Sequence, residues 1–265
     1  MSEIGGGSGS VDGREWINRL PRVVAPQAAA LMRLLEAVEA DPRVRALEIK
    51  GSMARGAADE HSDLDTRVWI SDDDFDAAVA DLPVLARAVA MPLDILFERP
   101  GSPFLFVQFV DGVQLELLAR RACEAKGRIA GEVVLLDRDG LLKNPYEPAP
   151  PWAMDKWSSW GWMALFDLDK HLRRGSLWEA LIRLEQARTL LLRHHAAETG
   201  VPDPEFGLTS ILDFDGTLPE RSEETVAGLD AAGLRRAGYA CAELLAAYDQ
   251  RPFGDFVLAR LATSD

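Results

Sequence analysis

Apolar residues change their spacing along the chain, and the change predicts two kinds of structure. In the first part, short apolar runs that alternate with polar residues predict β-strands, interrupted by two stretches with helical spacing. We expect Pro83 to divide the second of these helices, because proline lacks the amide hydrogen that a helix interior needs. The expected elements are strands over 44–50, 62–70, 92–97, 107–110, 113–118 and 131–137, and helices over 26–40 and 72–90.

Strand patterns end at a proline-rich segment. Four prolines within residues 144–151 exclude a helix or an inner strand, so we place a domain boundary there. Tryptophans crowd the beginning of the following part; most of these rings should pack between helices, and the alternative is that one or two line a substrate cleft. Helices are expected over 155–173, 177–197, 234–248 and 253–261.

The expected organisation is therefore a flexible lead followed by two domains. The glycine- and serine-rich N-terminus is typical of a flexible segment and belongs to the lead, residues 1–25. Residues 26–143 should form an α/β domain of the α+β kind, a mixed sheet with helices. Residues 150–265 should form an all-α helical bundle.

Composition and charge exclude several classes of protein. The chain has 265 residues, 48% of them hydrophobic, but no apolar run of the roughly 18 residues that a membrane helix needs. Cys123 and Cys241 lie far apart without metal-ligand spacing, which fits a reducing compartment, and we expect a cytoplasmic location. A formal net charge of −14 argues against a general nucleic-acid binder and would attract a cationic small substrate.

The candidate chemistry lies in residues 47–70, which predict a strand, a glycine-serine turn, a short helix and a second strand. Because side chains alternate along a strand, Asp63 and Asp65 should point to one face. Two carboxylates about 7 Å apart repel each other, and a cation such as Mg²⁺ relieves the repulsion. The opposite, core face should carry Leu64, Thr66, Val68 and Ile70.

The turn before the short helix has the residues that a phosphate group needs. Gly51 lets the backbone approach a ligand closely, and Ser52 offers a hydroxyl group. The helix presents free N–H groups, and Arg55 in its first turn is within reach of a phosphate tail. The alternative is an N-cap serine followed by a solvated acidic strand end.

Taken together, Gly51-Ser52, the small-residue helix and Asp63-Leu64-Asp65 resemble the signature of the DNA polymerase β-like nucleotidyltransferase superfamily. The resemblance implies two Mg²⁺ ions on the aspartates, a nucleoside triphosphate held by the turn, and a third carboxylate on a later strand. Asp111-Gly112 between two apolar runs predicts a hairpin, and Glu116 on its second strand is placed where the family has that carboxylate. Asp94 is the second choice.

Many members of the superfamily have aspartate at the third position, so it stays open whether Glu116 is a metal ligand, the general base, or both. By length and layout the chain resembles the small-molecule antibiotic nucleotidyltransferases of the lincosamide and aminoglycoside kinds. This resemblance implies an enzyme that transfers a nucleoside monophosphate, with AMP from ATP expected first, to a hydroxyl group of a small molecule. A homodimer is left open.

Glu185 lies on an apolar helix face, where it would orient or deprotonate the acceptor; the alternative is a surface ion pair with Arg188. Arg188 and His194 also resemble the Arg–His element of HEPN-type ribonucleases, but the chain has no basic stripe to bind RNA. A catalytically idle nucleotide-binding module and an enzyme that transfers AMP to a protein remain alternatives.

Residues 211–218 contain an Asp-Phe-Asp-Gly-Thr sequence that resembles the signature of haloacid dehalogenase-type phosphohydrolases. The resemblance would make Asp213 the nucleophile and Asp215 the general acid. Such a motif ends the first strand of a doubly wound sheet, and too little chain follows here to build one. We therefore reject this activity and expect an acidic loop between helices.

Overall fold

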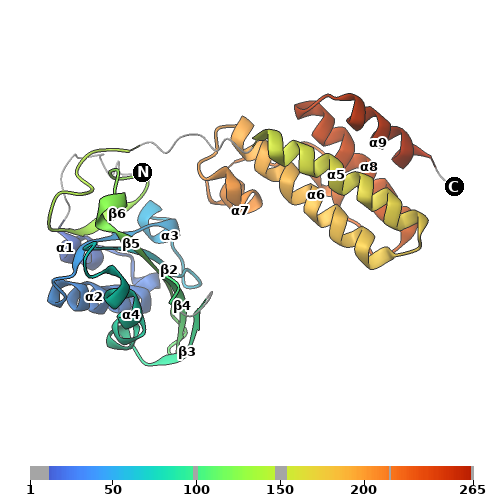
Figure 1. The fold of residues 1–265 in the computed structure, drawn as a ribbon. Helices are drawn as coiled ribbons and strands as arrows, with labels where there is room; N and C mark the ends of the chain where they lie inside the picture. The colour runs from blue at the N-terminus through green and yellow to red at the C-terminus, as the bar shows by residue number, and fades with distance from the viewer. Residues whose placement is uncertain (1–11, 98–100, 147–153, 215, 264–265) are drawn as a thin grey trace. The chain divides into compact units, whose positions relative to one another are not determined.

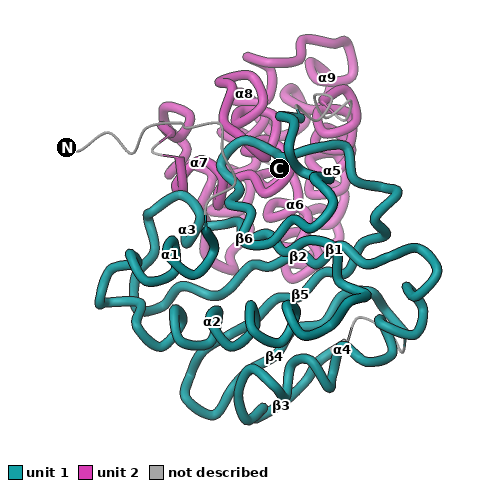
Figure 2. The backbone as a smooth tube through the Cα atoms, turned by 90° about the vertical axis from the view of Figure 1, so that its left-hand side faces the viewer, with its two compact units in different colours: residues 1–148 teal, residues 149–265 magenta. Residues whose placement is uncertain are grey.

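A computed structural model describes residues 12–97, 101–146, 154–214 and 216–263. The chain divides into two compact units, Met1–Pro148 and Ala149–Asp265, shown in different colours in Figure 2. Each unit has a hydrophobic core of its own. Over the described ranges, no helix combines the length and the apolar character that crossing a membrane requires.

The first unit is a six-stranded mixed sheet with helices packed on one face (Figure 1). The strand order is β3-β4-β5-β2-β1-β6; β2 and β5 run parallel, and the other neighbours are antiparallel. Its strands are β1 Val44–Ile49, β2 Leu64–Ile70, β3 Pro92–Phe97, β4 Phe104–Phe109, β5 Gln114–Arg121 and β6 Val133–Asp137. Its helices are α1 Gly13–Asn18, α2 Ala25–Ala40, α3 Gly51–Arg55 and α4 Phe75–Val89, with short 3₁₀ turns at Arg22–Val24 and Ala122–Glu124.

Alternation along the strands separates a core face from a polar face, as the sequence predicts. The expected core side chains of β2 are at most 1% exposed, and those of β5 are equally buried. They pack against α1, α2 and α4 in one cluster. The opposite face carries the acidic residues of β2 and β5 and a smaller apolar cluster of Ala46, Trp69, Val134 and Leu142.

Two expectations about the first unit are wrong. Helix α4 runs unbroken through Pro83, because Val79, Leu82 and Ala86 keep one side of the helix in the core while proline lies on the outer side. Within the expected flexible lead, Asp12 caps α1 by accepting hydrogen bonds from the N–H groups of Arg14 and Glu15, and Ile17 is buried. Residues 1–11 lie outside the described ranges.

The second unit is all-helical, and the four expected helices are confirmed with small shifts at their ends. Trp157 and Trp162 pack inside the unit, whereas Trp160 and Trp178 are exposed, and Trp152 lies outside the described ranges. The α-helices are α5 Met154–Arg173, α6 Leu177–Glu198, α7 Leu208–Asp213, α8 Ala231–Tyr248 and α9 Pro252–Ala262. Short 3₁₀ turns lie at Pro204–Phe206 and Ser222–Thr225.

Helix α7 corrects the first part of the expected acidic loop over residues 211–218: residues 211–213 are helical, whereas residues 214 and 216–218 lie outside regular secondary structure as expected. Ile211 is fully buried against Leu192 and Ala196 of α6, and this apolar anchor stabilises a turn and a half of helix ahead of the acidic residues. Asp213 is the last residue of the helix, and Asp215 lies outside the described ranges.

A buried carboxylate joins three helices of the second unit. Asp169 on α5 is fully buried and accepts hydrogen bonds from Arg173 of the same helix, Arg235 of α8 and Arg260 of α9. A buried carboxylate keeps its charge only when it is paired and hydrogen-bonded, and the arginines hold the pKa of Asp169 below its ordinary value against the opposing effect of burial.

Candidate functional site

The parallel register of β2 and β5 brings three carboxylates together. Asp65 is the direct partner of Glu116, and Asp63 points to the same face two residues earlier. One carboxylate oxygen of each residue lies within 4.8 Å of the others, and all three residues are partly exposed. The sequence-based selection of these three residues therefore corresponds to one cluster at the beginning of the two strands.

Asp94, the second choice for the third carboxylate, is not part of this cluster. It lies on β3, and β4 separates that strand from β5. Its side chain is exposed, and its Oδ1 accepts a hydrogen bond from the N–H of Ile95 at 2.8 Å.

The glycine turn lies directly against the Asp65 carboxylate. Gly51 has a φ angle of +68°, in the left-handed region that favours glycine, and a Cβ atom there would lie 2.0 Å from Oδ2 of Asp65. The N–H of Lys50 donates to the backbone carbonyl of Asp65 at 2.9 Å, which fixes the end of β1 beside β2. The carboxylate of Asp65 therefore requires glycine at this position. The sequence indicated only a close approach to a ligand as the reason for glycine.

Helix α3 is shorter than expected, with five residues from Gly51 to Arg55. Gly56 ends it in a left-handed conformation. The hydroxyl group of Ser52 makes no hydrogen bond to any residue in the part of the chain that the structure describes. A phosphate-binding role for Ser52 and Arg55 stays a prediction.

Burial and neighbouring charges raise the pKa of Asp65 to about 6. The largest cause is the loss of solvent around the carboxylate, followed by repulsion from Asp63, and Glu116 adds to it. Lys50 and Arg55 act in the opposite direction, because positive charges favour the ionised form. The cluster is therefore short of positive charge, although two cationic side chains already act on it.

A second polar network lies on the same face of the sheet, next to the acidic cluster. Glu48 of β1 is 1% exposed; its carboxylate accepts hydrogen bonds from Nε1 of Trp69 at 2.6 Å and from Arg67 at 3.1 Å. Arg67 also pairs with Glu132 at 3.1 Å, so one guanidinium serves two carboxylates. Burial and the neighbouring Glu132 raise the pKa of Glu48 to about 8.

The loop that leads to Asp63 is tied to helix α2. Gln27, which is buried, donates through Nε2 to the backbone carbonyls of Glu60 at 3.3 Å and Ser62 at 3.0 Å. The hydroxyl of Ser62 in turn bonds the carboxylate of Asp59 at 3.1 Å. These bonds hold the backbone immediately before the first carboxylate of the cluster.

Sequence reasoning missed Lys50, Glu48 and Arg67. Glu48 and Arg67 occupy alternate strand positions on the polar face, and Lys50 follows β1 directly in the same alternation. The period of two that identified Asp63 and Asp65 would therefore have identified them as well. A lone charge inside a strand usually faces solvent, and the sequence did not show that Glu48 and Arg67 pair with each other.

Glu185 lies in the helical unit and forms an i,i+3 ion pair with Arg188. This ion pair is the alternative that the sequence offered to a role at the acceptor. Arg188 also donates to the carbonyl of Thr225 at 3.0 Å. The ring of His194 is buried beside that of Tyr248, at 5.2 Å between centroids. A role of Glu185 toward an acceptor stays a prediction.

The donor set of the acidic cluster fits a hard divalent cation. Carboxylate oxygens are the ligands that Mg²⁺ prefers, and one or two carboxylates together with substrate phosphates are its usual environment. Burial, and after it repulsion from Asp63 and Glu116, raises the pKa of Asp65, and a bound cation would favour the ionised carboxylate against both effects.

Comparisons with known proteins do not assign a family. No family model matches the chain, and no curated protein is significantly similar to it. A solved structure of an aminoglycoside 6-adenyltransferase from Bacillus subtilis is similar over 88% of this chain and 97% of that chain, at 17% sequence identity and a TM-score of 0.37. A likeness this distant carries no argument, so the function must be argued from the geometry of the site.

Proposed function

We propose that the chain is a Mg²⁺-dependent nucleotidyltransferase that moves a nucleoside monophosphate, with ATP as the expected donor, onto a hydroxyl group of a small molecule. The observation that carries the proposal is the convergence of Asp63, Asp65 and Glu116 within 4.8 Å on two adjacent strands. The turn at Gly51 and Ser52, which contacts Asp65, supports it.

Asp63, Asp65 and Glu116 would hold two Mg²⁺ ions. When bound, such ions neutralise phosphate charge and make a coordinated hydroxyl group more acidic. No described residue outside this cluster belongs to a comparable group of potential ligands.

The remaining residues of the site would bind the triphosphate. The hydroxyl of Ser52 can donate to a phosphate oxygen, and Lys50 and Arg55 add positive charge on the side of the cluster where the turn lies. Phosphoryl-type transfer depends mainly on positioning and charge neutralisation, and these residues would supply both.

The reaction would form a bond between the acceptor oxygen and the α-phosphorus and break the bond to the β-phosphate, so that pyrophosphate leaves. The proton of the acceptor hydroxyl would pass to a carboxylate, for which Glu116 is the first candidate and Glu185 the second. Residues 150–265 would supply acceptor-binding side chains. Lincosamide and aminoglycoside antibiotics are the acceptor classes to test first.

The test is incubation of the purified protein with α-labelled nucleoside triphosphates, Mg²⁺ and a panel of hydroxylated antibiotics. We expect stoichiometric release of pyrophosphate and a labelled small-molecule product. Label on a protein would indicate protein AMP transfer, and bound nucleotide without pyrophosphate release would indicate an idle nucleotide-binding module. Release of phosphate from simple esters, with no dependence on Asp63, would overturn the proposal in favour of hydrolysis.

A further inference from the structure

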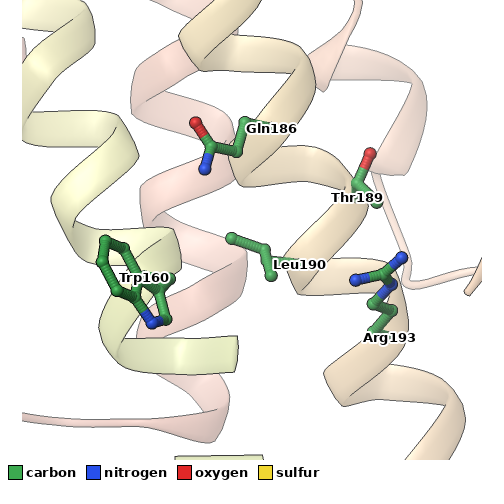
Figure 3. A pocket seen from close by; sticks show the side chains of 5 residues that line it. All are labelled: Trp160, Gln186, Thr189, Leu190 and Arg193. Atoms are coloured by element: carbon green, nitrogen blue, oxygen red, sulfur yellow. The ribbon is translucent and has the colours of Figure 1, made fainter. Parts of the chain in front are cut away.

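The helical unit contains a pocket of about 440 Å³ whose lining residues have no assigned role in the proposed transfer reaction. Trp160 of α5 lies on one side, and Gln186, Thr189, Leu190 and Arg193 of α6 form the rest (Figure 3). All five residues belong to the second unit, so the pocket is complete without residues of the acidic cluster.

Arg193 gives the pocket a positive charge that no protein group neutralises. Among the described residues no carboxylate lies within ion-pair distance of its guanidinium, and its Nε is buried without a hydrogen-bond partner. Arg188, on the same helix, differs because it has both Glu185 and a backbone carbonyl. A buried N–H without a partner is costly, and an anionic ligand would supply the missing acceptor.

The stem of the Arg193 side chain packs against the backbone of Gly207 before any ligand arrives. A Cβ atom at that glycine would be 3.3 Å from Cγ of Arg193. A guanidinium whose stem is fixed loses less conformational entropy on binding than a free surface arginine does.

The rest of the pocket offers apolar surface and little charge. Trp160 is 59% exposed, and Leu190 lies between Trp160 and Arg193 as Figure 3 shows. Gln186 accepts a hydrogen bond from Arg183 at 2.9 Å, which leaves its amide N–H groups for a ligand. An exposed aromatic ring beside an aliphatic side chain suits a flat apolar ring in a ligand.

We propose that this pocket binds a small aromatic carboxylate, with its ring against Trp160 and Leu190 and its carboxylate on Arg193. The charge of Arg193 disfavours a polycation, so the ligand belongs to a different chemical class from an aminoglycoside. Binding would require neither nucleotide nor Mg²⁺, because all of the contacts come from the helical unit.

The test is calorimetric titration of the full chain with naphthoate, in the absence of nucleotide and Mg²⁺, and with naphthylmethanol as the uncharged comparison. We expect naphthoate to bind more tightly than the alcohol, and R193Q to weaken naphthoate at least about tenfold while leaving the alcohol unchanged. W160L should weaken both ligands. R174Q and W178L change exposed residues outside the pocket and should bind as the wild type does.

Thr189→Trp tests binding to the pocket if R193Q does not fold. Thr189 is exposed, and a bulky ring at this position fills the pocket while Arg193 is retained. This variant should lose naphthoate binding. Four results would each overturn the proposal. The wild type could bind naphthoate and the alcohol with equal affinity, or not bind naphthoate at all. T189W could bind naphthoate as the wild type does, or the control variants could lose as much affinity as R193Q. None of these results depends on whether the chain transfers nucleotides.

Discussion

Asp65 of β2 and Glu116 of β5 are direct partners in a parallel strand pair, with their side chains on the face that the core does not cover. Two carboxylates in register on adjacent strands repel each other, and Asp63 on the same face adds a third charge. The fold thus keeps an unfavourable arrangement that a divalent cation would make favourable. This relationship defines what substitutions at the cluster should do.

The first prediction concerns activity. D65N keeps the size of the side chain but removes its charge, so a bound cation would lose a ligand. We expect a folded protein whose transfer rate falls at least about a hundredfold, measured as pyrophosphate release under saturating nucleotide and Mg²⁺. D94N is the matched control, because Asp94 is an exposed aspartate outside the cluster, and it should retain wild-type turnover. Near wild-type turnover in D65N would refute the metal-binding role.

The second prediction is that D65N stabilises the metal-free protein. The pKa of Asp65 is raised to about 6, so at neutral pH the ionised carboxylate lowers the free energy of unfolding. Asparagine removes that effect, and in EDTA at neutral pH the melting temperature should rise by roughly 2–4 °C. Mg²⁺ should raise the melting temperature of the wild type more than that of D65N. A lower melting temperature for D65N in EDTA would contradict the account in which burial and repulsion disfavour the ionised carboxylate.

The third prediction separates contact with Asp65 from backbone strain. Gly51 and Gly56 both have positive φ angles, of +68° and +72°, but a Cβ atom at Gly56 would meet nothing within 4 Å. Backbone strain should make alanine cost roughly 1 kcal/mol of folding free energy at either position, measured by denaturant unfolding, and G51A should cost more than G56A because its Cβ atom meets Asp65. Only G51A should also displace the Asp65 carboxylate, so its transfer rate should fall at least about tenfold below that of G56A. Equal rates in the two variants would show that the close approach is not needed.

Part of the cluster was predictable from local signals, because alternation fixes the face of Asp63 and Asp65 and the Asp-Gly turn predicts the strand that carries Glu116. The choice of Glu116 as the third carboxylate rested on the superfamily resemblance. That β2 pairs with β5, and in parallel, depends on packing between segments about fifty residues apart, which no local pattern encodes. The pairing of Glu48 with Arg67 could not be predicted for the same reason, because it depends on which strands lie side by side.

Other errors came from local rules that packing overrides. Pro83 lacks a helical hydrogen bond, yet the buried side of α4 keeps the helix continuous. Residues 211–213 form the end of helix α7, and not a loop, because Ile211 anchors them in an apolar cluster.

The fourth prediction is a pH dependence of stability that comes from Glu48. Its pKa is raised to about 8 in the folded protein, so its contribution to stability is present below the ordinary glutamate value and is lost as the pH rises through about 8. E48Q cannot ionise, and its amide oxygen can still accept from Trp69. The melting temperature of the wild type relative to E48Q should therefore fall between about pH 5 and about pH 9. A constant difference over that range would show that Glu48 does not titrate there.

The fifth prediction concerns the helical unit. D169N leaves Arg173, Arg235 and Arg260 around a neutral amide in a buried position, and three positive charges then repel one another without compensation. Removing one partner of a buried ion pair costs about 3–5 kcal/mol, and this cost is smaller where solvent reaches the remaining charges, as it does at the arginines. We therefore expect the free energy of unfolding to fall by roughly 2–4 kcal/mol.

D167N on the same helix is the matched control for the fifth prediction. Asp167 is partly exposed and pairs with Lys170 and Arg183, and surface pairs of this kind contribute about 1 kcal/mol or less. Because α5, α8 and α9 meet at Asp169, D169N should also speed amide hydrogen exchange in all three helices, while D167N should change it only locally. If D169N destabilised the chain no more than D167N, the carboxylate of Asp169 would not be needed to hold the three helices together.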